Sequence, residues 1–230
     1  MTQFMSNSLF FGAAISLIAY EAGLLLKRKF KMAIFNPLLI AIIAVIAVLC
    51  LLHIDYDTYN QSGQYISYLL TPATVCLAVP LYQQMELLKK NLKAVIIGIV
   101  SGVLASLVSV LLLAKLFSLS HEQYVTLLPK SITTAIGMGV SEELGGIVTI
   151  TVAVIIITGV LGNMIAETVI KLARIEEPIA KGLALGTSAH AIGTAKAMEL
   201  GEIEGAMSSL AIAVAGLLTV VGASVFAQFM

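Results

Sequence analysis

The chain has 230 residues, of which 59% are hydrophobic and only 11% charged, and its mean hydropathy is +1.02. Soluble domains usually carry about 25% charged residues, so this composition leaves too little polar surface for a water-soluble globule. The 13 basic and 13 acidic residues balance, which argues against a nucleic-acid-binding protein. The apolar residues form continuous runs, whereas the strands of a barrel would alternate. We therefore predict an all-α integral membrane protein embedded in a lipid bilayer.

About eight hydrophobic segments are expected along the chain. They lie near residues 8–26, 34–52, 65–82, 92–117, 125–140, 146–170, 180–198 and from 206 to the end. The first segment carries Glu21 and precedes its basic cluster instead of following one, so it does not resemble a cleavable signal peptide.

The early segments contain residues that shape helices. Asn36 and Pro37 open the second segment, and Pro72 and Pro80 are predicted to kink the third. The remaining features are assigned to packing: Gly98 and Gly102 to close helix contact, and Cys50 and Cys76 to buried positions.

The distribution of Lys and Arg predicts the orientation of the segments, because basic residues favour the cytoplasmic side. The clusters at 27–31 and 89–93 and the loop 171–181 are all expected inside, with the N-terminus outside. Simple alternation through eight spans would place the loop 171–181 outside. One segment between 118 and 146 must therefore fail to cross, and the segment near 125–140 is expected to be broken or re-entrant.

A weak internal repeat supports a transporter-like architecture. Sliding the chain by 116 residues overlays hydrophobic blocks on hydrophobic blocks and aligns Thr71 with Thr187 and Glu86 with Glu202. Chance is the alternative, because identities are few. We interpret the chain as a single transmembrane domain, residues 1–230, with repeats at about 8–117 and 124–230. The basic loops give the halves opposite orientations, and inverted repeats with broken helices are a mark of secondary transporters.

The segment near 125–140 holds the first candidate site. Pro129 breaks the helix, and Lys130 follows it at a depth where a cation is costly and tends to be kept for function. Gly137 is a further candidate for the broken region. Three hydroxyl residues complete a set that suits a small carboxylate: Ser131, Thr133 and Thr134. In the alternative interpretation Lys130 snorkels to an interface and the hydroxyls bond their own helix.

The segment near 180–198 holds the second candidate site. Gly186 and Gly193 bracket His190 among small hydroxyl residues, which are Thr187, Ser188 and Thr194. One interpretation is tight helix packing around a hydrogen-bonded histidine. The other is a second unwound element that lines a cavity, where His190 could carry a proton near neutral pH.

Motifs typical of enzymes are absent from the sequence. The three histidines are far apart, and no HExxH, GxSxG, P-loop or GxGxxG motif occurs. We therefore expect no catalytic residues, no metal and no cofactor. Five carboxylates are expected at water-exposed helix ends: Glu142, Glu143, Glu199, Glu202 and Glu204.

Several motifs together resemble the LrgB/CidB family of bacterial membrane proteins, over nearly the whole chain. The resemblance rests on Leu128-Pro129-Lys130-Ser131 with Thr133-Thr134, on Gly186-Thr187 with His190 and Gly193-Thr194-Ala195, on Asn36-Pro37-Leu38-Leu39, on Pro72 with Pro80-Leu81-Tyr82, on Gly145-Gly146-Ile147, and on Glu204-Gly205-Ala206 with Ser208-Ser209-Leu210-Ala211. Ser141-Glu142-Glu143 departs from the pattern of some relatives.

The resemblance implies two classes of function. Family members are called holin-like or antiholin-like and are linked to murein hydrolase activity and cell lysis, and they work with a smaller LrgA/CidA-type partner. Relatives include bacterial pyruvate uptake systems and a plastid glycolate/glycerate translocator. We therefore expect a multi-pass protein of the bacterial plasma membrane that forms homo- or hetero-oligomers. It would be a secondary transporter of small monocarboxylates or, alternatively, a modulator of lysis.

Overall fold

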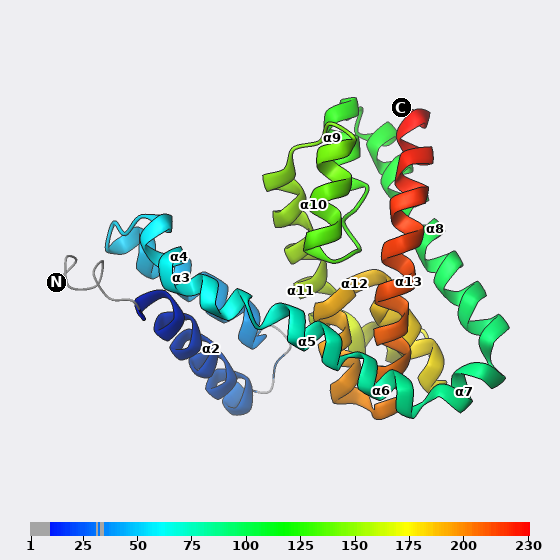
Figure 1. Cartoon of the computed structure of the whole chain (residues 1–230), viewed down its shortest axis with the longest axis horizontal. Coiled ribbons are helices and arrows are strands. Elements are labelled where there is room, and N and C mark those ends of the chain that lie inside the picture. The colour runs from blue at the N-terminus through cyan, green and yellow to red at the C-terminus, as the bar shows by residue number, and fades with distance from the viewer. Residues whose placement is uncertain (1–9, 31, 33–34) are drawn as a thin grey trace. The chain divides into compact units, whose positions relative to one another are not determined.

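The computed structural model describes residues 10–30, 32 and 35–230, and the chain divides into two compact units, Met1–Cys76 and Leu77–Met230 (Figure 1). The described residues contain helices and no strands, in agreement with the all-α prediction. The boundary between the units differs from the boundary expected between the repeats, and the inverted repeat stays a prediction.

Unit 1, defined as Met1–Cys76, is built on packing of its first helix against the two that follow. Its helices in the described residues are α2 (Phe11–Phe30), α3 (Pro37–Leu51), α4 (Tyr56–Ser67) and α5 (Leu70–Cys76). The side chain of Asn36 caps α3 by accepting hydrogen bonds from the amides of Leu38 (2.9 Å) and Leu39 (3.2 Å), and Pro37 occupies the first helical position. Asn36 and Pro37 thus begin a helix.

Unit 2, defined as Leu77–Met230, contains the remaining described helices. They are α6 (Ala78–Gln83), α7 (Met85–Lys90), α8 (Leu92–Leu116), α9 (His121–Leu127), α10 (Thr134–Glu143), α11 (Val148–Leu172), α12 (Pro178–Leu200), α13 (Glu202–Phe226) and the 3₁₀ turn η1 (Ala227–Phe229). Three helices among the described residues are long and apolar enough to cross a membrane: α8, α11 and the stretch Glu202–Phe229 that joins α13 to η1.

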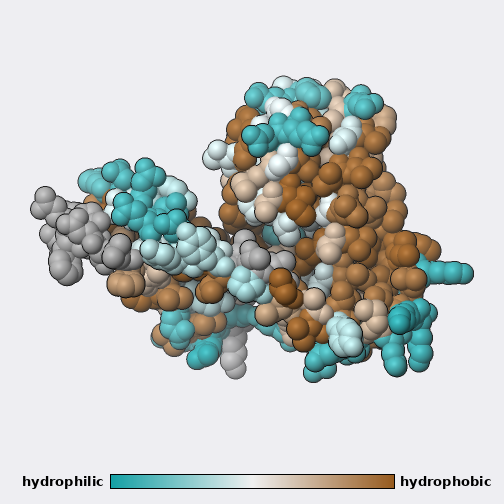
Figure 2. Space-filling model, in the orientation of Figure 1, coloured by the Kyte–Doolittle hydropathy of each residue, from teal (hydrophilic) through white to brown (hydrophobic). Residues whose placement is uncertain are grey.

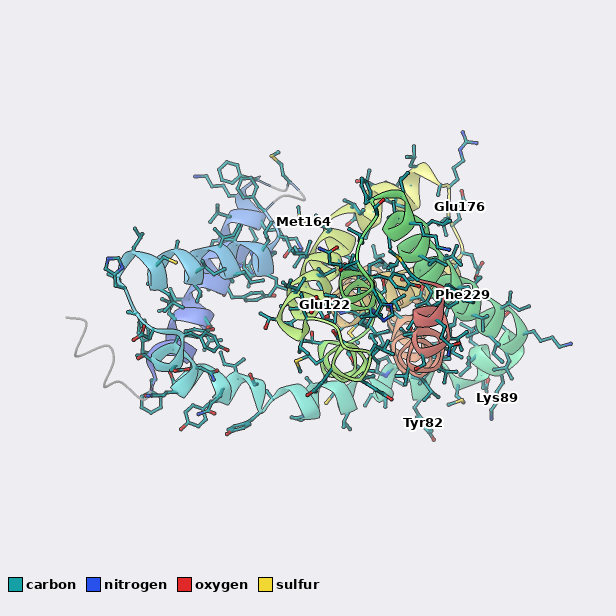
Figure 3. The ribbon with its side chains drawn as sticks, turned by 90° about the horizontal axis from the view of Figure 1, so that it is seen from above. Tyr82, Lys89, Glu122, Met164, Glu176 and Phe229 are labelled. Carbon is teal, nitrogen blue, oxygen red and sulfur yellow. The ribbon has the colours of Figure 1, made fainter. Side chains whose placement is uncertain are left out.

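The surface of unit 2 is consistent with a bilayer around it. On the face shown in Figure 2, polar residues gather at two opposite ends and apolar residues cover the surface between them. Large apolar side chains such as Ile97, Leu112 and Leu217 are 68%, 61% and 70% exposed, which is favourable only against lipid or an apolar partner. The same helices bury their other face in the interior of unit 2. Figure 3 shows unit 2 from the end that carries Glu122 and Phe229.

The hydrophobic segment predicted near 65–82 is not one continuous span. It consists of the end of α4, then α5, then α6, with turns between them. Pro72 and Pro80 each lie in the first turn of a short helix, where the missing N–H costs nothing. These prolines accompany helix starts instead of kinking a longer helix. Cys50 and Cys76 are exposed, so the expectation that they are buried is wrong.

The segment between α8 and α11 enters unit 2 and turns back. α9 and α10 are joined by a turn over residues 128–133. The amide of Ile147 donates to Thr126 Oγ1 at 2.8 Å. Thr151 Oγ1 donates to the Thr126 carbonyl at 2.9 Å and lies 2.7 Å from Ser141 Oγ, within hydrogen-bond distance. The chain has therefore returned to the side of α9 before α11 begins. We call α9, the turn and α10 the first hairpin.

α12 also turns back on itself. Ala189 (φ −124°, ψ 15°) and His190 (φ 42°, ψ −134°) leave helical geometry and divide α12 into arms over residues 178–188 and 191–200. A Cβ on Gly193 would lie 2.5 Å from the carbonyl oxygen of Leu185 in the first arm, which places the second arm beside the first. Each arm is about 15 Å long, half of a bilayer core of about 30 Å. We call α12 the second hairpin.

Ion pairs show that the second hairpin begins and ends at one end of unit 2. Lys181 in the first arm lies 3.9 Å from Glu204 at the start of α13. Lys196 in the second arm lies 2.7 Å from Glu167 near the end of α11. The two hairpins therefore enter from opposite ends. The loop 171–181 and the beginning of α8 lie at the same end, which is the arrangement that the basic residues favour.

Candidate functional site

A groove of about 930 Å³ runs between α8 and the first arm of the second hairpin, and the turn of the first hairpin closes its inner end. Asn91 and Glu177 line its mouth, and Lys130 and Ser131 line the opposite end. Gly98 of α8 and Leu183 of α12 face each other between these two ends, because a Cβ on Gly98 would lie 2.9 Å from the Leu183 side chain. We call this cavity the α8–α12 groove.

Small residues on one face of α8 make room for the groove. Gly98, Ser101, Gly102, Ala105, Ser106 and Ser109 line it, at the spacing of a single helix face. A Cβ on Gly102 would lie 2.7 Å from Thr187 Oγ1, so α8 and the second hairpin approach closely here. The glycines that the sequence assigns to packing therefore pack α8 against α12 and also line the groove.

Lys130 marks the inner end of the groove and is held by hydroxyl groups. Its ammonium donates to Ser131 Oγ at 2.9 Å, and Ser131 Oγ also accepts from Ser106 Oγ at 3.1 Å. Among the described residues that line the groove, Lys130 is the one cation and Glu177 the one anion. An ammonium has three N–H donors, so Lys130 retains donors for an anionic ligand.

The turn of the second hairpin lies close behind Lys130. His190 is 3% exposed, and its Nε2 lies 3.0 Å from the carbonyl oxygen of Ile155 on α11. Thr187 and Ser188, which come just before the break, line the same groove as Lys130. The positive φ of a buried, non-glycine residue is strained backbone, and such strain gathers at functional sites.

α11 is shaped to hold this turn. A Cβ on Gly159 would lie 2.8 Å from His190 Cε1 and Nε2, so only glycine leaves room for the imidazole. Asn163 Nδ2 donates to the Ile192 carbonyl at 3.0 Å, just after the break. This hydrogen bond ties the beginning of the second arm to α11. The packing interpretation of His190 and the broken-helix interpretation therefore describe the same local structure.

The structure brings together half of the predicted ligand residues. Lys130, Ser131, Thr187 and Ser188 line the α8–α12 groove. His190 faces α11, and Thr194 is fully buried with its hydroxyl 2.7 Å from Ser208 Oγ. The other two predicted residues lie at the beginning of α10, where Thr133 precedes the helix and Thr134 is its first residue.

The predicted helix-breaking residues have different local roles. Pro129 is buried in the turn of the first hairpin. Gly137 lies within α10 against Ile155, and Gly186 and Gly193 lie in the helical arms of the second hairpin. A Cβ on Gly186 would lie 2.6 Å from the Ser208 carbonyl, so this glycine allows close contact with α13. The chain breaks between Gly186 and Gly193, at Ala189 and His190.

One carboxylate differs from its expected position. Glu204 is buried, at 8% exposure, and faces Lys181 across 3.9 Å. Its helix packs against the second hairpin, which removes it from the water expected at a helix end. Lys196 is paired with both Glu167 (2.7 Å) and Glu199 (3.0 Å). Within the described residues, no three His, Cys, Asp or Glu side chains gather to hold a metal ion.

Comparison with known proteins decides the family. The model of the LrgB-like family matches residues 16–229. The chain belongs to the LrgB-like family. It is 40% identical, over 96% of its own length and of theirs, to proteins named antiholin-like protein LrgB from Bacillus mycoides (strain KBAB4), Bacillus cereus (strain B4264) and Bacillus anthracis (strain CDC 684 / NRRL 3495). No solved structure matches the chain. Membership and the three apolar helices together identify this LrgB-like chain as a membrane protein.

Proposed function

We propose that this LrgB-like protein is a secondary transporter of small monocarboxylates, such as pyruvate or glycolate, with its substrate site at the inner end of the α8–α12 groove. It would span the bacterial plasma membrane several times and act with an LrgA/CidA-type partner. The observation that carries the proposal is Lys130, a cation at the closed end of a hydroxyl-lined groove, where two broken helices meet.

The charge of the site favours an anion. An ammonium at membrane depth is costly unless a counter-charge or water compensates it. Two helices also begin near it: α10 at Thr134 and the second arm of α12 after His190. Their N-terminal ends carry partial positive charge and free amides. Discontinuous helices that begin near mid-membrane bind anionic substrate groups in secondary transporters.

The size of the site favours a small substrate. Thr187 and Ser131 are only 6% exposed, and the groove between them and Ser106 is narrow because α8 and α12 touch at Gly102. The hydroxyls of Ser106 and Ser131 accept and donate hydrogen bonds, so they suit oxygen atoms next to a carboxylate. A bulky or strongly apolar ligand would leave these groups unpaired.

His190 is proposed as the group that couples transport to protons. Its ring is buried, and Thr187 and Ser188 just before it line the groove that holds the positive charge of Lys130. A bound anion would offset that charge and so favour protonation of the ring. Substrate and proton would then each raise the affinity for the other, as thermodynamic linkage requires.

A second candidate function is supported by the relatives, which are named antiholin-like proteins. In this interpretation the protein modulates murein hydrolase activity and cell lysis through other membrane proteins. A lytic pore would need an oligomer with a wide lumen. The interior of unit 2 holds fully buried side chains of α13, including Ala206, Met207 and Ala211, so one copy of unit 2 encloses no such lumen.

Uptake by purified protein separates the two functions. Labelled pyruvate and glycolate are offered to proteoliposomes that contain this chain, with and without an LrgA-type protein. The transporter proposal predicts saturable uptake that is inhibited by excess unlabelled substrate and is not inhibited by an inorganic anion such as chloride. Equal leakage of all small solutes supports a holin-like pore. No flux of any solute, together with altered murein hydrolase activity in cells, supports a modulator of lysis.

A further inference from the structure

We infer that the α8–α12 groove is a water-filled path to Lys130, open only at the end of unit 2 where α8 and α12 begin. This inference rests on the proposed transport function, because the path would carry the substrate to Lys130. The accessibility of the groove is nevertheless measured without any substrate.

The depth of the groove supports a path. It extends along α8 from Asn91 to Ser109, and 18 residue steps correspond to about 27 Å. A bilayer core is about 30 Å thick, so the groove passes through most of it. Ser106, which is hydrogen-bonded to the Lys130 partner Ser131, lies beyond the middle of α8.

The lining of the groove supports water within it. Ser101 and Ala105 are exposed along α8, and Ser188 is exposed on the facing arm of α12. Six hydroxyl residues and the Lys130 ammonium line this one cavity, and they provide hydrogen-bond partners for a chain of waters. An aqueous path also lowers the cost of a cation at this depth.

The opposite end is closed by apolar packing. Beyond Lys130, the first hairpin and the upper half of α8 bury Leu107, Tyr124, Val125 and Leu128 at 0–1% exposure. The hydroxyl of Tyr124 donates to the Phe226 carbonyl at 2.9 Å, which ties α9 to the end of α13. Water that reaches Lys130 therefore enters from the mouth between Asn91 and Glu177.

The side of the membrane follows from charge. Lys89 and Lys90 precede α8 at the mouth. Lys171 lies in the last turn of α11, and Arg174 lies on the loop before α12. Basic residues mark the cytoplasmic side. The structure thus corresponds to a state in which Lys130 faces the cytoplasm and is sealed from outside.

Thiol labelling tests this inference on the full chain. Cys50 and Cys76 are first replaced by Ala, and single cysteines are then introduced in adjacent pairs on α8. Ser101→Cys and Ala105→Cys lie in the groove. Val100→Cys and Leu104→Cys are controls at the same depths, since these side chains are exposed but do not line the groove. A charged, membrane-impermeant methanethiosulfonate is applied to inside-out and right-side-out membrane vesicles.

The expected result is a difference in both face and side. Ser101→Cys and Ala105→Cys should react at least about tenfold faster than their neighbours in inside-out vesicles, because the reactive thiolate forms in water and not in lipid. In right-side-out vesicles all four should be unreactive. Two results would overturn the inference. In the first, the groove cysteines react only with a membrane-permeant maleimide, which indicates that lipid or a partner helix occupies the groove. In the second, the groove cysteines react with the impermeant reagent in right-side-out vesicles.

The outcome is separable from the proposed function. Labelling from inside without any substrate uptake would leave the water path in place and refute transport. Saturable uptake with unreactive groove cysteines would keep transport and refute this path. The rate of labelling should also depend on the depth of the cysteine in the groove. Ser109→Cys at the inner end should react more slowly than Ser101→Cys near the mouth.

Discussion

Replacing Lys130 by Met tests the centre of the proposal. Met retains an unbranched side chain of similar volume and removes the charge. In the structure the ammonium makes one hydrogen bond, 2.9 Å to Ser131 Oγ, and is only partly buried. Losing one such bond while relieving a cation from membrane depth should change the free energy of unfolding by no more than about 1 kcal/mol. The variant should therefore insert and fold.

The effect on substrate binding should be much larger. A hydrogen bond to a charged group contributes about 1.5–3 kcal/mol net. At about 1.4 kcal/mol per factor of ten, this corresponds to roughly 10- to 150-fold weaker binding of a carboxylate. Coulomb attraction at about 4 Å with an effective dielectric constant near 20 gives about 4 kcal/mol before desolvation costs, so the upper part of that range is reasonable.

The assay is initial uptake of labelled pyruvate by proteoliposomes over a range of concentrations. Lys115→Met is the matched control, because Lys115 is an exposed lysine at the far end of α8, away from the groove. Lys130→Arg keeps the charge and should retain part of the activity. If Lys130→Met transports within twofold of the unaltered protein, the ammonium does not bind substrate. If Lys130→Met is lost from the membrane, the lysine has a structural role.

Three further predictions concern coupling, packing and orientation. His190→Gln should retain uptake but lose its dependence on an imposed pH gradient; continued accumulation driven by a proton gradient would place coupling elsewhere. Gly159→Ala should lower the free energy of unfolding in detergent by about 1–3 kcal/mol, because the added Cβ would lie 2.8 Å from the His190 ring. Gly139→Ala is the control and should not lower it, because nothing lies within 4 Å of its Cβ. Equal stability of the two variants would contradict the close contact between Gly159 and His190. Arg174→Cys should be labelled by an impermeant reagent only from the cytoplasmic side, and labelling only from outside would invert the orientation.

The first hairpin was predictable because its break has a local cause. Pro129 cannot donate a backbone hydrogen bond, and the helices stop on either side of residues 128–133. The topological argument from Lys and Arg pointed to the same segment. Local chemistry and charge distribution thus point to the same segment, and the structure shows that its helix is interrupted there.

The turn of the second hairpin was less predictable because its cause is tertiary. The glycines at 186 and 193 suggested unwinding, but both lie in helical arms. The positive φ falls on His190, and its ψ of −134° lies outside the left-handed helical region that non-glycine residues can adopt. Gly159 and Asn163 on α11 provide the space and the hydrogen bond that hold this turn, and they lie about 30 residues away in sequence.

The groove residues of α8 were visible in the sequence but could not be interpreted from it. Gly98, Ser101, Gly102, Ser106 and Ser109 form one face of a predicted helix. Such a stripe of small residues is typical of close packing between membrane helices. Because α12 turns back at His190, only a half-length helical arm lies beside the small residues of α8. The groove therefore continues beyond the end of this arm to Lys130. The function of the stripe therefore depends on a distant break in another helix.

The paired hairpins favour a carrier over a pore because they enclose a site without enclosing a channel. The first hairpin closes the path above Lys130, and the second forms the wall below it. Opening the other side requires movement of the first hairpin against α8, where Ser106 and Ser131 share one hydrogen bond of 3.1 Å. A single part-buried hydrogen bond is a modest tie, whereas several hydrogen bonds of Thr126, Ser141 and Thr151 join the hairpin to α11. Opening would also have to break the apolar core that Leu107 of α8 shares with Tyr124 and Leu128 of the hairpin. Such a movement would expose Lys130 to the outside while the hairpin stays with α11. An antiholin-like effect on lysis would then follow from a change in carboxylate flux, with no need for a lumen in this chain.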